Sequence, residues 1–349
     1  MTCRILPNLP LPKVVPFAGL SKEGRPACTK PRFAGRSRGD FLIHAYSMVR
    51  PLIGALGRRF LMGELQKRIN IFEETMAHMT YVQIEEAAGK GTPVLFPVGV
   101  IEEHGPHLPL AVDVYGSYLQ ARGVKSELEK KGIQSLIAPP FYWGMNVATG
   151  AFGGSFSCHE ETMISVLSDA MSSLKNWGFK RIFFMNHHMD SGHMKALDKA
   201  IRRAHSEAGI GAYLVIDSFF LKGLGMRANE PHLLIHESLS SSGPPSPYLN
   251  IHAEGYETSF MWHYLPELVK EEVLKNLKPT NLVFKDLLVW TKGGREAREV
   301  TPHGYFGDPA TASPERGRRE MEAYGKTAAG VIEAFLLGRY SPPKDPNPR

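Results

Sequence analysis

Apolar, strand-like segments alternate with helical segments along most of this chain of 349 residues. The first, "TPVLFPVGVI" at 92–101, is apolar at nearly every position, as in a strand buried on both faces of a parallel sheet. Similar segments lie at 135–143 ("SLIAPPFYW"), 180–188 ("KRIFFMNHH") and 211–220 ("GAYLVIDSFF"). Helical patterns lie at about 114–131, 159–177, 191–208 and 314–337. This alternation predicts one layered α/β domain with a mostly parallel central sheet.

Two capping-box patterns mark helix starts in this arrangement. Thr80 with Gln83, and Ser157 with Glu160, have the spacing at which two side chains each satisfy a backbone N–H group at a helix N-terminus. The patterns predict that one helix begins directly after Thr80 and that another begins near residue 159.

Positive charge is concentrated in the first 61 residues. The whole chain carries +6 at pH 7, but residues 1–61 hold eleven Lys or Arg against Glu23 and Asp40, so the remainder carries −3. That remainder gives no reason to expect nucleic-acid binding. We predict a basic, disordered N-terminal extension over 1–61. Its segment 41–61 could instead be an interfacial helix or an organelle-targeting peptide, and a translation start at Met62 is a further alternative.

Cysteine content and hydropathy narrow the class of protein further. Cys3, Cys28 and Cys158 are the three cysteines, so neither a disulfide framework nor a cysteine metal site is expected. No run of 18 or more apolar residues occurs, which excludes an ordinary transmembrane helix. We therefore expect a soluble, cytoplasmic protein without a transmembrane segment.

Two loops rich in histidine and carboxylate follow predicted strands. "PVGVIEEHGPHLPLAVD" (97–113) leaves the first strand, and "NHHMDSGH" (186–193) leaves the third. The carboxyl ends of parallel strands meet at one edge of a sheet, where ligands bind. The two loops could therefore share a site.

The spacing of side chains in these loops suits metal ions. Glu102 and His104 are two residues apart, as are His188 and Asp190, and Asp113 returns at a predicted helix start. Imidazole and carboxylate groups suit Zn²⁺ or Mn²⁺, and a pair of such ions can polarise a carbonyl group and activate water. The alternative is that these are solvated or packed loop side chains, and spacing alone leaves both readings open.

At these residues the sequence resembles the creatininase family of metal-dependent amidohydrolases. Its members carry a segment close to P-V-G-S-x-E-Q-H-G-P-H-L-P-L-x-x-D, and "HAEGYETS" (252–259) is similar to their H-A-G-x-x-E-T-S. "GYFGDPATASPERG" (304–317) matches near the end, so the resemblance covers about 75–338. It implies a creatininase-like domain over 72–338, with a short tail at 339–349. The implied fold is a three-layer α/β/α sandwich with a mostly parallel central sheet, often assembled as a homo-oligomeric hexamer.

The resemblance also implies a set of metal ligands. Glu102, Asp113 and His188 would hold one divalent ion. His104, Asp113 and Asp190 would hold the other, so that Asp113 bridges the two. The expected cofactors are two ions of zinc or manganese, or both, with iron as an alternative.

The same resemblance implies two residues that act beside the metals. His252 matches a histidine that transfers protons, and Glu257 matches a glutamate that is a ligand or a support for one. Glu103 replaces the usual glutamine, and we expect it to face solvent. His187 stands where glycine is usual, and Met189 stands where creatinine-cleaving members carry an aromatic residue.

The implied activity is hydrolysis of a non-peptide C–N amide bond, possibly cyclic, in a small molecule. Three alternatives stay open at this point. Family relatives include a formamide deformylase acting on a pyrimidine ribonucleotide precursor of flavins and deazaflavins, and a peptidase that trims the mycofactocin precursor peptide. A member that binds metal or ligand without turnover is the third.

Overall fold

The central element is a parallel β-sheet, whose strands lie in the order β2-β1-β3-β4-β5. The computed structural model of the chain describes residues 69–237 and 248–343. Within these ranges the strands are β1 Val94–Val98, β2 Leu136–Ile137, β3 Arg181–Asn186, β4 Gly211–Asp217 and β5 Leu233–His236. All four neighbouring pairs run parallel, as predicted from the apolar character of the strands.

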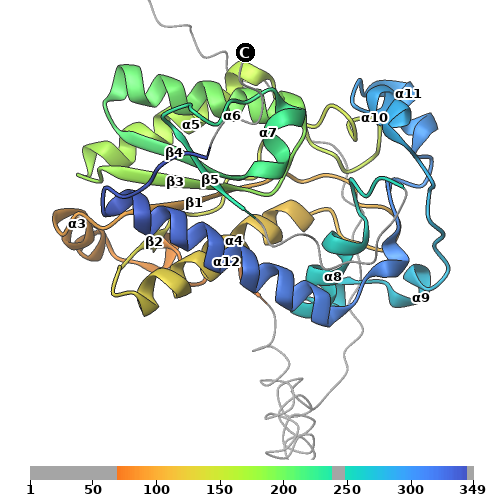
Figure 1. Cartoon of the computed structure of the whole chain (residues 1–349), viewed down its shortest axis with the longest axis horizontal. Helices are drawn as coiled ribbons and strands as arrows, with labels where there is room; N and C mark the ends of the chain where they lie inside the picture. Colours follow the sequence, from red (N-terminus) through yellow and green to blue (C-terminus); the bar gives the residue numbers. More distant parts are fainter. Residues whose placement is uncertain (1–68, 238–247, 344–349) are drawn as a thin grey trace, which may run out of the picture. The chain divides into compact units, whose positions relative to one another are not determined.

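Long helices cover both faces of this sheet (Figure 1). On one face lie α5 (Glu160–Asn176) and α6 (Ser191–Arg203), and on the other lie α4 (Val112–Lys130) and α12 (Pro314–Leu336). The predicted three-layer α/β/α sandwich is therefore confirmed.

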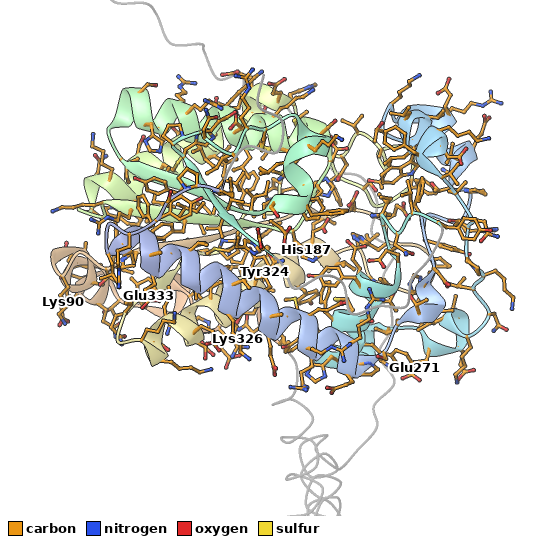
Figure 2. The ribbon with its side chains drawn as sticks, viewed as in Figure 1. Lys90, His187, Glu271, Tyr324, Lys326 and Glu333 are labelled. Carbon is orange, nitrogen blue, oxygen red and sulfur yellow. The ribbon has the colours of Figure 1, made fainter. Side chains whose placement is uncertain are left out.

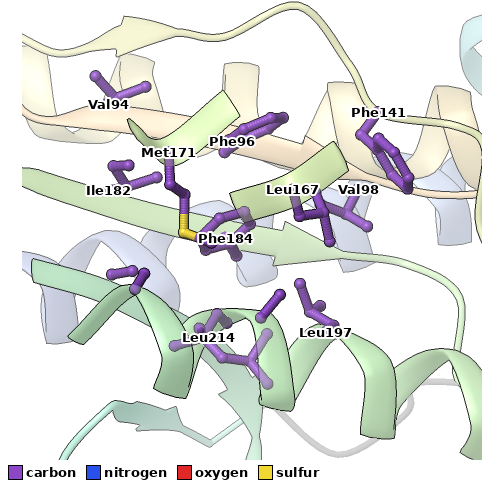
Figure 3. Packing of buried hydrophobic residues seen from close by; sticks show 14 of the residues in the cluster. Val94, Phe96, Val98, Phe141, Leu167, Met171, Ile182, Phe184, Leu197 and Leu214 are labelled. Atoms are coloured by element: carbon purple, nitrogen blue, oxygen red, sulfur yellow. The ribbon is translucent and has the colours of Figure 1, made fainter. Parts of the chain in front are cut away.

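Alternating side chains of each strand supply two separate cores. Phe96 and Phe184 point to the α5 and α6 side, where their rings stack with centroids 5.1 Å apart (Figure 3). Leu95 and Phe183 point to the α4 and α12 side. Because successive residues of a strand face opposite sides, an apolar run fills both layers. Each fully buried side chain of this size contributes about 1.5–3 kcal/mol to folding.

Shorter elements connect these layers and extend them beyond the sheet. They are η1 Met76–His78, α3 Tyr81–Gly89, the π-helical turn η2 Ala204–Ala208, α7 Ser218–Leu224, α8 Gly255–Tyr264, η3 Pro266–Leu268, α9 Glu271–Leu274, α10 Phe284–Trp290, α11 Gly294–Val300 and η4 Pro309–Thr311. Helices α8 to α11 lie together at one end of the sheet in Figure 1, where the strands end.

Three elements are shorter in the structure than the sequence predicts. The second strand ends at Ile137, because the two prolines that follow cannot donate to a strand ladder. The fourth ends at Asp217, whose carboxylate accepts from Phe219 N and so starts α7. The helix predicted over 191–208 is α-helical only to Arg203 and then widens into the π-helical turn.

One of the two capping boxes forms. Thr80 and Gln83 cap α3 reciprocally, as predicted. The prediction for Ser157 is wrong: α5 begins after His159 without a side-chain cap, and Ser157 Oγ instead accepts a hydrogen bond from Asn146 N at 2.9 Å.

Some predictions fall on other parts of the chain. The reading of residues 1–61 as a basic extension lies outside the described residues, as do the last six residues of the predicted tail. Among the residues that the structure does describe, none of the helices has the length and apolar character that crossing a membrane requires.

Candidate metal centre

Two adjacent strands deliver the polar loops to the same edge of the sheet. β1 and β3 pair over their whole length, and Val98 at the end of one lies opposite Asn186 at the end of the other. Gly99 then allows the chain to pass the start of α4, since a methyl group there would lie 2.6 Å from the carbonyl oxygen of Asp113. This close approach places Asp113, in the first turn of α4, beside the loop after β3.

A first group of ligand atoms consists of Glu102, Asp113 and His188. His188 Nδ1 lies 3.0 Å from Glu102 Oε1 and 3.2 Å from Asp113 Oδ2. The other ring nitrogen, Nε2, is 3.0 Å from the Met145 carbonyl oxygen, so Nε2 carries the proton and Nδ1 faces the carboxylates. Thr149 Oγ1 donates to Glu102 Oε2, which holds that carboxylate in place.

A second group consists of His104, Asp113 and Glu257. His104 Nε2 lies 3.8 Å from Asp113 Oδ1 and 3.7 Å from Glu257 Oε2, and it has no hydrogen-bond partner within the described part of the chain. Its Nδ1 lies 3.2 Å from the Glu102 carbonyl oxygen and donates to it. Asp113 thus belongs to both groups, through one carboxylate oxygen to each.

The donor set fits two divalent cations. Two ligand atoms that share one ion at about 2.1 Å in tetrahedral geometry lie about 3.4 Å apart. The nitrogen–oxygen separations in both groups are 3.0–3.8 Å. All five side chains are buried, and imidazole with carboxylate is the donor chemistry that Zn²⁺ and Mn²⁺ accept.

In the electrostatics of the cluster, buried carboxylates and imidazoles shift each other's pKa. Burial alone would raise the pKa of Asp113, but His104, His187 and His188 bring it well below its usual range. Burial would likewise raise the pKa of Glu257, and His104 lowers it to about 2. In turn, Glu102 and Asp113 outweigh burial and raise the pKa of His188 well above its ordinary value. A cation that binds here replaces protons.

His252 lies next to both groups, and its ring forms a further group of possible ligand atoms with Glu102 and His104. Its Nε2 is 2.8 Å from the Glu103 carbonyl oxygen and donates to it, while Nδ1 lies 3.8 Å from Glu102 Oε1. The ring lies 4.4 Å from that of His104 and 5.7 Å from that of Trp290. Burial lowers the pKa of His252, but Glu102 and Glu103 raise it to about 10.

A strained turn joins His252 to the second ligand group. Ala253 has a φ of 50°, a left-handed conformation that is unusual for alanine. Its N–H donates to Glu257 Oε2 at 2.5 Å. This turn brings both His252 and Glu257 next to the His104 ring.

The expectation that Glu103 faces solvent is wrong. This carboxylate is 7% exposed, with Oε2 accepting from Gly105 N at 3.0 Å and Oε1 3.5 Å from His252 Nε2. Gly304, with a φ of +74°, lies against it, because a methyl group there would come within 2.0 Å of Oε2. The sequence signal for this burial, which the prediction did not use, is a pair of glycines, Gly105 and Gly304, that make room for the Glu103 carboxylate.

Asp190 is placed differently from the other predicted ligands, and the groups of ligand atoms among the described residues do not include it. Its Oδ1 caps α6 by accepting from Gly192 N and His193 N. Its Oδ2 accepts from Val147 N and Ala148 N. Both oxygens are thus engaged by backbone amides, and in the group with His104 and Asp113 the third possible ligand atom belongs to Glu257.

Other histidines have structural partners. His107 Nε2 lies 2.9 Å from Thr258 Oγ1 on α8. His232 joins Asp198 and Glu230 in a further group of possible ligand atoms. Arg202 already forms salt bridges with both of those carboxylates, so each has a cationic partner without an ion.

Comparison with known proteins agrees with this arrangement. A family model described as creatininase, creatinine amidohydrolase, matches residues 77–332. The chain belongs to the creatininase family. It is therefore a creatininase-family hydrolase, and the matched segment contains every side chain of the two ligand groups.

Individual members of the family are distant relatives. The chain is 28% identical over 232 residues to a mycofactocin precursor peptide peptidase of Mycobacterium ulcerans, covering 65% of this chain and 78% of that protein. It is 27% identical over 265 residues to a creatinine amidohydrolase of Pseudomonas putida, covering 74% and 95%. A solved structure described as "Creatininase Mn" superposes with a TM-score of 0.56 at 20% identity, over 75% of this chain and 98% of that one, which shows the fold.

Proposed function

We propose that this protein is a metal-dependent amidohydrolase with two divalent cations. The observation that carries the proposal is the sharing of Asp113, which offers one oxygen to Glu102 and His188 and the other to His104 and Glu257. Zinc and manganese suit this donor set, and iron is an alternative. Bound there, the ions would polarise a carbonyl group and lower the pKa of a water molecule.

The residues around the ligands have separate tasks in this proposal. Glu102 and Glu257 would each hold one of the two ions together with Asp113, and Met145 and Thr149 fix the orientation of the first ligand group. These contacts keep the ligands in place before any substrate arrives.

His252 is the proton-transfer residue of the proposal. Its Nε2–H is engaged by a backbone carbonyl, and Nδ1 faces Glu102 on the metal side. The pKa of about 10 belongs to the metal-free site, and two cations bound nearby would lower it, so that Nδ1 could accept a proton and pass it to the leaving nitrogen. Trp290 packs against the ring and keeps water away from it.

The proposed substrate is a small molecule with a non-peptide C–N amide bond, linear or cyclic. A peptide substrate is the second candidate, because a precursor peptide peptidase is among the relatives that share a little over a quarter of their residues with this chain. The Glu103 carboxylate, which lies beside His252, would repel an anionic substrate. A neutral amide therefore suits the site better.

Metal analysis followed by an activity screen tests the proposal. Protein purified without chelator should contain about two equivalents of zinc, manganese or iron by plasma mass spectrometry. It should then hydrolyse members of a panel of lactams, linear amides and short peptides, and assay of formate release separates a deformylase from the rest. Absence of metal, with none taken up on titration, would contradict the proposal. Two bound ions without turnover would favour a non-catalytic binding protein.

Homo-oligomeric assembly, which the family resemblance implies, is a separate proposal. Light scattering coupled to size exclusion measures the mass directly, and six times the chain mass of 38.8 kDa would identify a hexamer.

A further inference from the structure

His187 contacts Asp113, the carboxylate common to both ligand groups. Its Nδ1 is 3.1 Å from Asp113 Oδ1, and the residue is 8% exposed. Oδ1 is the oxygen that faces His104, whereas Oδ2 faces His188. The contact from His187 therefore reaches only one of the two carboxylate oxygens.

The ring of His187 is fixed from three sides. It stacks on Tyr256 with centroids 5.8 Å apart and meets Phe260 edge-on at 5.1 Å, both on α8. Figure 2 labels His187 near the centre of the molecule. On the α4 side a methyl group on Gly116 would come within 2.5 Å of the ring. The imidazole therefore has one orientation, with Nδ1 toward Asp113.

The hydrogen-bonding roles follow from the partners. A carboxylate only accepts, so Nδ1 carries the proton and donates it to Oδ1. Nε2 has no hydrogen-bond partner among the described residues, and the groups of ligand atoms do not include His187. The His187 side chain thus has a single polar partner, the Asp113 carboxylate.

We propose that His187 is a positioning residue that makes the two metal positions unequal. The inference depends on the two-metal function proposed above. Its N–H fixes Oδ1 for the ion held with His104 and Glu257, and leaves Oδ2 to be oriented by the ion held with Glu102 and His188. Loss of a hydrogen bond to a metal ligand typically weakens binding about 10–100-fold.

Zinc titration of the metal-free full chain by calorimetry tests this inference. His187→Leu fills the slot between α4 and α8 without a donor, whereas His187→Asn returns an amide N–H near the position of Nδ1. We expect His187→Leu to weaken one zinc equivalent at least about tenfold and to leave the other unchanged. We expect His187→Asn to restore most of the lost affinity, which a purely packing role would not do.

A second variant tests the same hydrogen bond from the α4 side of the His187 ring. Gly116→Ala displaces the ring while His187 itself is retained, and we expect the same selective loss of one equivalent. His205→Leu is the matched control, because His205 Nε2 contacts Ala212 O at the start of β4, and the ligand groups lie at the opposite ends of the strands. It should bind both equivalents as the wild-type protein does.

The outcomes separate this inference from the function on which it depends. Unchanged affinity of both equivalents in His187→Leu and Gly116→Ala would overturn it. Equal weakening of both equivalents, without recovery in His187→Asn, would also overturn it, since His187 would then support the whole site by packing. If the wild-type chain takes up no zinc, the two-metal function fails first. If His187→Leu does not fold, Gly116→Ala and His187→Asn decide.

Discussion

At the scale of single residues, Asp113 has the widest consequences. It is 1% exposed and is the one residue common to the two ligand groups that it forms with Glu102 and His188 and with His104 and Glu257. We expect Asp113→Ala to lose both metal equivalents and to reduce activity by more than about 100-fold, because the loss of a ligand costs more than the loss of its hydrogen-bond partner. Plasma mass spectrometry and the amide assay check this. Full metal content in the variant would refute the shared role.

Asp190 offers a sharper test between two roles for one carboxylate. In the structure it caps α6 and accepts four backbone hydrogen bonds. We expect Asp190→Ala to lower the free energy of unfolding by about 1 kcal/mol or more, while Asp190→Asn, also a good cap, retains most of it. Both variants should keep two metal equivalents. Loss of one equivalent in Asp190→Asn would return Asp190 to the ligand set.

Protonation of the ligands makes metal uptake depend on pH. Burial lowers the pKa of His104, but Glu257 and Asp113 raise it above its ordinary value, and carboxylates raise the pKa of His188 further. Both rings therefore bind a second proton more readily than a free histidine does, and ions displace these protons. We expect affinity to rise with pH and protons to be released on binding. Calorimetry in buffers of different ionisation enthalpy counts them, and a count of zero contradicts this.

At the scale of elements, the site depends on how the end of β1 passes the start of α4. A methyl group on Gly99 would lie 2.6 Å from the Asp113 carbonyl oxygen, and backbone on both sides cannot yield. We expect Gly99→Ala to cost about 1–3 kcal/mol of stability and to weaken metal binding. Gly89, at the end of α3, is the control, since a methyl group there meets nothing within 4 Å. Equal behaviour of the two variants in urea denaturation would contradict the argument.

The sequence was informative about elements with strong periodicity. The buried strands and the long helices α4, α5 and α12 follow from apolar patterns, because tertiary packing and local preference agree there. β5 and the helices α8 to α11 were not predicted. β5 has only four residues, and α10 and α11 seven each, which is too short for a period to be distinguished.

The candidate site was predictable in composition and less so in detail. The i, i+2 spacing and the family resemblance placed Glu102, His104, Asp113 and His188, which the structure brings together. The role of Glu257 depends on a strained turn at Ala253, and that of Asp190 on amides from a loop more than forty residues away. Neither interaction leaves a local pattern in the sequence.

At the scale of the whole molecule, buried neutral histidines predict sensitivity to acid. Burial lowers the pKa of His107 and of His236 to about 4, against about 6.5 in an unfolded chain. The unfolded state therefore takes up protons first, so stability is full above pH 6.5 and is lost as the pH falls to 4. Each group contributes about 3 kcal/mol to this loss.

Urea denaturation of the wild-type chain and of His107→Gln at pH 7 and pH 4.5 checks the acid prediction. We expect the variant to be less stable at pH 7, because the contact with Thr258 changes, but to lose less stability between the two pH values. Parallel pH dependence in the two proteins would show that His107 does not titrate on unfolding.

The burial of the ligands has a kinetic consequence. The residues of both groups are at most 9% exposed, so exchange of a bound ion depends on motion of the surrounding loops. Exchange is then governed by the rate of that motion, and not by affinity alone. The ion bound to a given protein molecule would then depend on which metals were available when that molecule folded. Two preparations of one sequence could thus differ in metal content when they are compared before exchange is complete.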